Sequence, residues 1–80
     1  MNSNEIIKLI EKILEVKPGS ITENTLAKDV ESWDSMSHLS ILVSLDKKLS
    51  GQVAEINEIA EADSVKKILV ALKAHKLITS

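Results

Sequence analysis

Ser35 and His38 are three residues apart, a spacing at which two side chains on one helix can meet. A serine beside a histidine is the arrangement of a nucleophile and its general base. The rest of such a site is missing from the sequence, because no Gly-x-Ser-x-Gly turn surrounds Ser35 and no third residue is placed to orient His38. We therefore expect no catalytic residue, and we interpret His38 and His75 as surface residues.

The composition argues against several other chemistries. The chain of 80 residues has no cysteine, so it offers no thiol for catalysis or for a zinc site, and its two histidines are far apart. All ten basic residues are lysines and Trp33 is the only aromatic residue, which disfavours a tight anion clamp and a base-stacking platform. We therefore expect no bound metal and no nucleic-acid partner.

The length and the apolar pattern set further expectations. No apolar run approaches the roughly 18 residues that a membrane-spanning helix needs, and the N-terminal segment lacks the features of a signal peptide. A domain of this size buries only about 60% of the surface of its unfolded chain, which leaves little interior for a substrate pocket. We expect residues 1–80 to form one domain that is monomeric, cytoplasmic, not bound to a membrane and not an enzyme.

A helix and a long loop precede Ser35. Asn2 and Glu5 have the spacing of a capping box, and apolar residues then recur at helical spacing, which predicts a helix over residues 3–16. Pro18 and Gly19 are expected to end it. The loop over residues 17–34 is unusually long for a compact domain. Four apolar residues are expected to pin this loop to the core: Ile21, Leu26, Val30 and, at its end, Trp33.

Ser35 itself is expected at the start of the next helix, over residues 35–49, with Asp34 as its N-cap. The apolar stripe of this helix comprises Met36, Leu39, Leu42, Val43, Leu45 and Leu49, widened by Ile41. A brief helix is expected over about residues 56–61, and a last one after the N-cap Ser64, with Val65, Ile68, Leu69 and Leu72 on one face. These patterns predict an all-α fold, a small four-helix bundle with three main helices and a short third one.

The segment from Asp29 to Asp46, DVESWDSMSHLSILVSLD, resembles the signature of the acyl carrier protein family. In that family an Asp-Ser-Leu or Asp-Ser-Met triplet opens the second helix, and here the triplet is Asp34-Ser35-Met36. The apolar residues that follow also match, and so do the long loop, the short third helix and the Ser64-Val65 start of the last helix. The resemblance covers the whole chain.

The resemblance implies that Ser35 carries a covalent 4′-phosphopantetheine arm, which a phosphopantetheinyl transferase transfers from coenzyme A. Asp34 would then assist the transferase and its metal besides capping the helix. The free N–H groups and the partial positive charge of a helix N-terminus suit a phosphodiester at Ser35. Because the transferase supplies the catalysis and the arm supplies the thiol, neither an activating base nor a cysteine is needed in the chain.

The charges suggest where partner enzymes bind. Residues 29–63 hold eight acidic residues and two lysines, a net charge of −6, whereas residues 64–80 hold four lysines and no acidic residue. An acidic face attracts basic partners. We expect the transferase, a loading ligase and downstream acyl-processing enzymes to contact a surface that combines apolar and acidic residues, namely Met36, Val43, Glu55, Glu58 and Glu61.

The middle of the second expected helix departs from the pattern of fatty-acid carriers, whose second helix is strongly acidic. Ser40 and Ser44 occupy that part of the helix, and Lys47 and Lys48 follow Asp46. The departure favours a specialised biosynthetic pathway for lipids or secondary metabolites. Two alternatives stay open: a carrier of aminoacyl, peptidyl or D-alanyl groups, and a helical adaptor that never carries the arm.

Overall fold

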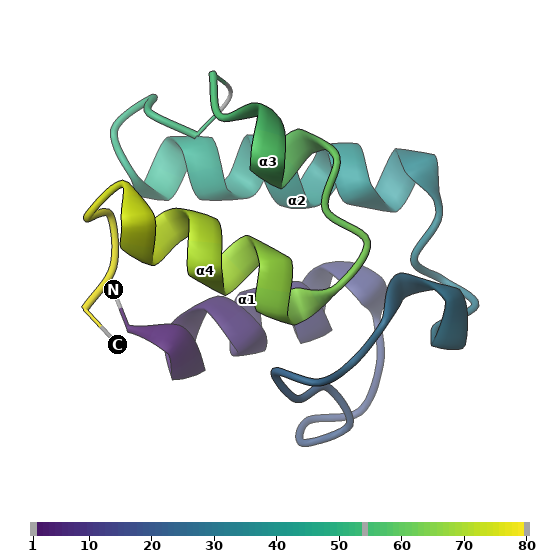
Figure 1. Cartoon of the computed structure of the whole chain (residues 1–80). Helices are drawn as coiled ribbons and strands as arrows, with labels where there is room; N and C mark the ends of the chain where they lie inside the picture. Colours follow the sequence, from purple (N-terminus) through teal and green to yellow (C-terminus); the bar gives the residue numbers. More distant parts are fainter. Residues whose placement is uncertain (1, 54, 80) are drawn as a thin grey trace.

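The computed structural model describes residues 2–53 and 55–79. In these residues the chain forms four α-helices and one 3₁₀ turn: α1 (Ser3–Leu14), η1 (Ala27–Asp29), α2 (Ser35–Lys48), α3 (Asn57–Ala60) and α4 (Val65–Ala74). The described part of the chain contains no strand, only an isolated antiparallel bridge between Leu26 and Ser64. The all-α prediction is confirmed, with three main helices and a short third one. Figure 1 shows α4 between α1 and α3, with α2 running behind α3.

The three main helices begin where the sequence predicts, because each has a polar side chain that accepts from a free backbone N–H. Asn2 accepts from Glu5 N–H and the Glu5 carboxylate accepts from Asn2 N–H, which completes the capping box. Asp34 accepts from Ser37 N–H at the start of α2. Ser64 accepts from Lys67 N–H at the start of α4.

Each main helix is followed by a residue in the left-handed backbone conformation. The end of α1 lies two residues before the predicted one. Glu15 has φ 57°, so α1 stops at Leu14 rather than at residue 16, before Pro18 and Gly19 are reached. Ser50 after α2 and Lys76 after α4 adopt similar angles. In each case the next backbone N–H bonds to a carbonyl five residues earlier, as in a Schellman motif. These bonds are Val16 to Glu11, Gly51 to Asp46 and Leu77 to Leu72.

The core is built from aliphatic side chains of all four α-helices. Its fully buried members are Ile6, Ile10, Leu14, Ile41, Leu45, Val53, Ile59, Val65, Ile68 and Leu72. The predicted apolar face of α4 is therefore confirmed. The predicted stripe on α2 is only partly right: Ile41, Leu45 and Leu49 point inward and Leu42 is half-buried. Met36, Leu39 and Val43 are exposed because they lie on a different side of the helix.

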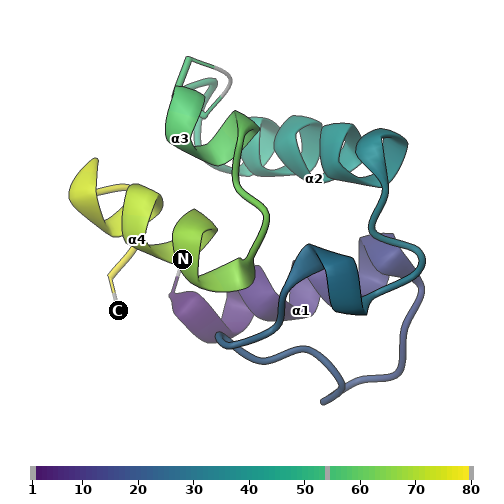
Figure 2. The same cartoon turned by 45° about the vertical axis from the view of Figure 1, so that its right-hand side comes forward.

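The loop between α1 and α2 is fastened to α1 by polar contacts. Glu11 is 6% exposed, and one oxygen of its carboxylate accepts from Gly19 N–H at 2.8 Å and from Ile21 N–H at 3.1 Å. The Ser32 hydroxyl donates to the Leu14 carbonyl at 2.9 Å. Figure 2 shows the result, with the end of the loop lying beside the end of α1 and below the start of α2.

The apolar residues expected to pin this loop to the core differ in how deeply they are buried. Ile21 and Trp33 are buried and Val30 is half-buried, as predicted, but Leu26 is 37% exposed. The loop is held near Leu26 by its backbone instead. Ala27 N–H donates to the Asp63 carbonyl at 2.7 Å, and Val65 N–H donates to the Thr25 carbonyl at 3.1 Å. The loop and the start of α4 thus hold each other in place.

The described residues form no helix that is long and apolar enough to cross a membrane.

Candidate functional site

Ser35 is exposed at the first position of α2. Within the described residues, no hydrogen bond occupies its hydroxyl. The preceding Asp34 takes up two nearby donors: its carboxylate accepts from Ser37 N–H and its carbonyl accepts from His38 N–H, both at 2.9 Å. The hydroxyl of Ser35 is therefore presented to solvent at the positive end of an ordered helix.

The Asp34 carboxylate is held in its ionised form. The backbone N–H of Ser37, the largest influence on it, lowers the pKa of Asp34 below its ordinary value. The Lys67 ammonium, 2.8 Å from Asp63, likewise lowers the pKa of Asp63. Both carboxylates are stronger acids in the folded chain than in the unfolded one, so folding is favoured where they are ionised.

An acid titration tests this cap. The stabilisation by Asp34 is fully present above its ordinary pKa and is lost as the pH falls through its lower folded value. At pH 7, Asp34→Ala should unfold at a lower urea concentration than the wild-type protein. The difference between the two urea midpoints should shrink below about pH 4. A difference that stays constant from pH 7 to pH 3 would show that the carboxylate charge has no part in capping α2.

A groove of about 600 Å³ opens beside Ser35. Its walls come from the loop, from α2 and from the segment that joins α3 to α4. It is lined by Ala27, Trp33, Asp34, Ser35, His38, Leu39, Leu42, Ala60, Ala62 and Asp63. The apolar walls can take a thin, partly apolar group, and the two carboxylates at Asp34 and Asp63 offer hydrogen-bond acceptors.

Trp33 and His38 form one wall of this groove. Trp33 is 7% exposed, so its predicted packing role at the end of the loop is confirmed. Its indole Nε1–H donates to His38 Nδ1 at 3.0 Å, and the two rings stack with centroids 6.0 Å apart. His38 Nε2 lies 2.9 Å from the Ile59 carbonyl of α3. The expectation that His38 is a surface residue was wrong, because these contacts keep it half-buried; His75 is exposed as expected.

Three apolar side chains remain exposed along α2, next to Ser35. Met36 is 76% exposed, Leu39 56% and Val43 47%. Their positions, spaced by three and four residues, put them on one side of the helix. We call these three residues the α2 stripe. The sequence assigned Met36 and Val43 to partner binding and Leu39 to the core, and all three lie at the surface. The spacing of these three residues in the sequence already indicates a second apolar side of the helix, separate from the side that faces the core.

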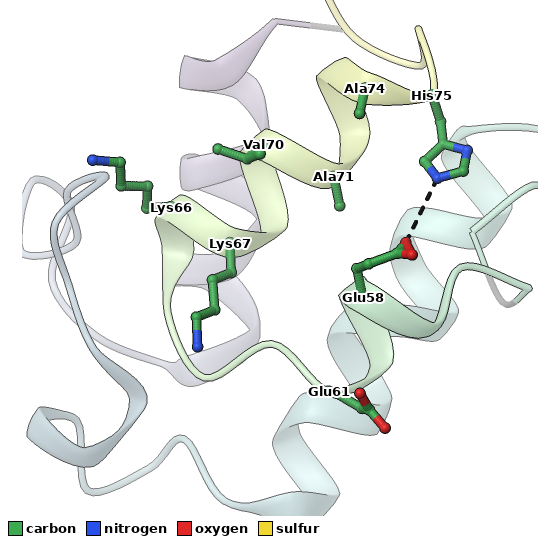
Figure 3. A pocket seen from close by; sticks show the side chains of 8 residues that line it. All are labelled: Glu58, Glu61, Lys66, Lys67, Val70, Ala71, Ala74 and His75. Carbon is green, nitrogen blue, oxygen red and sulfur yellow. Dashed lines mark ion pairs between the residues drawn. The ribbon is translucent and has the colours of Figure 1, made fainter.

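The acidic residues assigned to partner binding lie elsewhere on the surface. Glu55, Glu58 and Glu61 are all exposed, at or near α3. Figure 3 shows Glu58 and Glu61 on the α3 side of a second groove, opposite Lys67 and His75 of the α4 side. Glu58 lies 3.6 Å from His75 Nε2. The structure thus does not bring Glu58 and Glu61 into the Ser35 groove; the acidic residue that joins Asp34 there is Asp63, which sequence reasoning did not assign.

Among residues 2–53 and 55–79, no cluster of three histidine or carboxylate side chains is arranged to hold a metal ion. Comparison of the chain with protein-family models, with curated proteins and with solved structures found no match. The function is therefore inferred from the geometry at Ser35 and from the sequence around it.

Proposed function

We propose that this chain is a carrier protein that holds acyl groups as thioesters on a 4′-phosphopantetheine arm attached to Ser35. The observation that supports this most is the Ser35 hydroxyl, which is exposed at the capped N-terminus of α2 and has no hydrogen-bond partner among the described residues. A modifying enzyme can reach such a hydroxyl without unfolding the chain. The Asp34-Ser35-Met36 triplet around it resembles the attachment sequence of acyl carrier proteins.

Attachment of the arm requires no catalytic residue from this chain. A phosphopantetheinyl transferase would join the Ser35 oxygen to the phosphate of the arm as the pyrophosphate linkage of coenzyme A breaks. The nucleotide part would leave with the other phosphate of that linkage, and a base of the transferase would accept the serine proton. The chain contributes an accessible oxygen, a helix N-terminus that suits the resulting negative phosphodiester, and Asp34 to order the first turn. Once attached, the arm supplies the thiol that a protein without cysteine lacks.

The α2 stripe suits brief contacts with several enzymes. It places exposed apolar area within one to eight residues of Ser35, while Glu55, Glu58 and Glu61 add negative charge near α3. Small apolar contacts combined with long-range charge give fast, weak association, which a carrier needs if it is to release each partner. The polar middle of α2 distinguishes this surface from the acidic helix of fatty-acid carriers and supports a dedicated set of partners.

Intact-mass measurement tests the proposed function. The purified chain would be incubated with coenzyme A and a phosphopantetheinyl transferase of broad specificity. We expect the mass to increase by one phosphopantetheine group and by no more than one. If several such transferases leave the mass unchanged, the carrier function is rejected and the helical adaptor becomes the better hypothesis.

The cargo needs a separate experiment, because aminoacyl carriers use the same arm. The loaded chain would be offered to acyl-activating and aminoacyl-activating ligases encoded near its gene. We expect a thioester with an acyl group. If only aminoacyl thioesters form, the proposed acyl carrier function is wrong and the chain is an aminoacyl carrier.

Charge reversal near α3 should slow partner binding. Glu55→Lys and Glu61→Lys each remove a negative charge from an exposed position and add a positive one. We expect each to lower the association rate with the transferase roughly two- to fivefold at low salt. The effect should fade as added salt shortens the Debye length to about 8 Å. Stopped-flow association rates at several ionic strengths measure it. Glu58 is left unchanged here because its carboxylate lies 3.6 Å from His75 Nε2, so that its reversal would also change this contact.

Glu23→Lys is the matched control, since Glu23 is exposed on the loop after α1. It changes the net charge by the same amount and should leave the association rate nearly unaltered. Equal slowing by all three reversals would mean that the overall charge matters and that no acidic docking face exists near α3.

A further inference from the structure

Two consecutive hydrogen bonds connect the loop, α2 and α3 beside Ser35. They run from the Trp33 indole at the end of the loop, through the His38 imidazole on α2, to the Ile59 carbonyl on α3. The two distances are 3.0 Å and 2.9 Å, and the two rings also stack at an interplanar angle of 22°. We call these three residues the Trp33–His38–Ile59 bridge.

The two hydrogen bonds of the bridge require one particular tautomer of the His38 ring. An indole N–H can only donate, so His38 Nδ1 must accept and therefore carries no proton. A backbone carbonyl can only accept, so His38 Nε2 must donate and therefore carries the proton. The bridge thus requires the neutral imidazole with its proton on Nε2. The imidazolium, which donates from both nitrogens, cannot make the bond to Trp33.

The bridge supports α3, the shortest α-helix in the described part of the chain. α3 has four residues, and no side chain caps its start at Ile56. The Ile59 side chain is fully buried, which anchors α3 to the core, and the bond from His38 adds a polar anchor at the Ile59 carbonyl. The next residues, Ala60 and Ala62, line the Ser35 groove. His38 therefore holds the α3 wall of that groove and, through Trp33, the loop wall as well.

We propose that His38 is a positioning residue, which holds Trp33 and α3 as the two walls of the groove beside Ser35 and so keeps the start of α2 in the shape that the modifying enzyme uses. The existence of the bridge can be tested on the unmodified chain. Its effect on modification rests on the proposed carrier function. The carrier function fails if the wild-type chain accepts no arm, whereas the positioning role fails if the variants below behave alike.

The first experiment uses the single tryptophan of the chain as a reporter. In His38→Ala, Trp33 should emit at longer wavelength and be quenched more strongly by acrylamide, because its indole N–H has lost its partner. His38→Gln should restore the wild-type spectrum, since a glutamine amide can accept from Trp33 and donate to the Ile59 carbonyl. His38→Phe, which keeps a ring but has no polar atom, should resemble His38→Ala. If His38→Phe matches the wild type and His38→Gln does not, the ring fills space and the bridge has no positioning role.

The second experiment measures the tautomer directly and does not depend on any variant. Long-range ¹H–¹⁵N correlation spectra near neutral pH should show His38 Nδ1 without a proton and Nε2 with one. A proton on Nδ1 would overturn the proposal even if His38→Ala failed to fold.

The third experiment connects the bridge to Ser35. The kcat/KM for arm transfer should fall about three- to tenfold in His38→Ala, as expected for the loss of one or two ordinary hydrogen bonds. It should stay within about twofold of wild type in His38→Gln. Equal rates for the wild type, His38→Ala and His38→Gln would show that the walls of the groove do not affect modification of Ser35.

Discussion

Ser35→Ala is expected to abolish attachment of the phosphopantetheine arm and to leave the fold intact. The substitution removes the hydroxyl oxygen to which the arm would be bonded, and Ser37, the other serine in the first turn of α2, is half-buried. Because Ser35 is exposed and its hydroxyl is unoccupied, the free energy of unfolding should change by less than about 0.5 kcal/mol. Intact mass and urea denaturation measure the two quantities on the same sample.

Ser40→Ala is the matched control for this experiment. Ser40 is also exposed on α2, but it lies in the second turn and its hydroxyl donates to the Met36 carbonyl at 3.2 Å. This variant should accept the arm like the wild type. Arm attachment to Ser35→Ala, or peptide mapping that locates the arm on another serine, would disprove Ser35 as the site.

Ile41→Ala is expected to cause a large loss of stability. Ile41 is fully buried, and truncating such a side chain removes about 2–5 kcal/mol through lost burial and the cavity that remains. A chain of this size has little stability to lose. Should Ile41→Ala fail to fold, Ile41→Val should still fold and lose about 0.5–1.5 kcal/mol. Urea denaturation gives both values.

Val43→Ala provides the comparison, since Val43 lies two residues away on the exposed α2 stripe. It should change the free energy of unfolding by less than about 0.5 kcal/mol. Similar losses at Ile41 and Val43 would mean that α2 is rotated about its axis relative to the structure. The comparison therefore also tests whether Met36 and Leu39 are free to contact partners.

Local signals explain why the helix starts could be predicted from the sequence. Asn2, Asp34 and Ser64 each precede an apolar periodic segment, and an N-cap interaction spans only three residues. The end of α1 was harder to place, because Glu15 adopts a left-handed conformation that glycine would favour more. The helix stops as its terminal carbonyls gain partners, before the proline is reached.

The sequence pattern of α2 does not determine which side of the helix faces the core. Six apolar residues of this helix and its C-cap Leu49 cover more than one side of it, so periodicity alone permits several rotations about its axis. The structure selects Ile41, Leu45 and Leu49 because these meet the buried side chains of the other helices. Leu42, expected in the core, is consequently only half-buried.

The surroundings of Ser35 depended on contacts between distant residues, which the sequence did not reveal. His38 contacts a carbonyl twenty-one residues later, and Glu11 receives donors eight and ten residues later. Such partners are backbone groups, which leave no trace in the choice of amino acid at the accepting or donating position. The exposed position of Ser35 at the start of α2 could thus be predicted, while the groove beside it could not.

The backbone contacts between the loop and the start of α4 make residues 28–62 a closed excursion of the chain. The excursion leaves at Ala27 and returns at Asp63, two residues joined by a hydrogen bond of 2.7 Å. It contains Ser35, the α2 stripe and the three glutamates near α3, whereas most of the lysines lie outside it. Because the two ends of this segment already meet, we expect that the segment can be replaced as one unit. Its buried residues Ile41, Leu45 and Ile59 would have to be retained, because they pack in the core. If the chain is a carrier as proposed, the residues expected to contact partners all lie within this excursion, and α1 and α4 lie outside it.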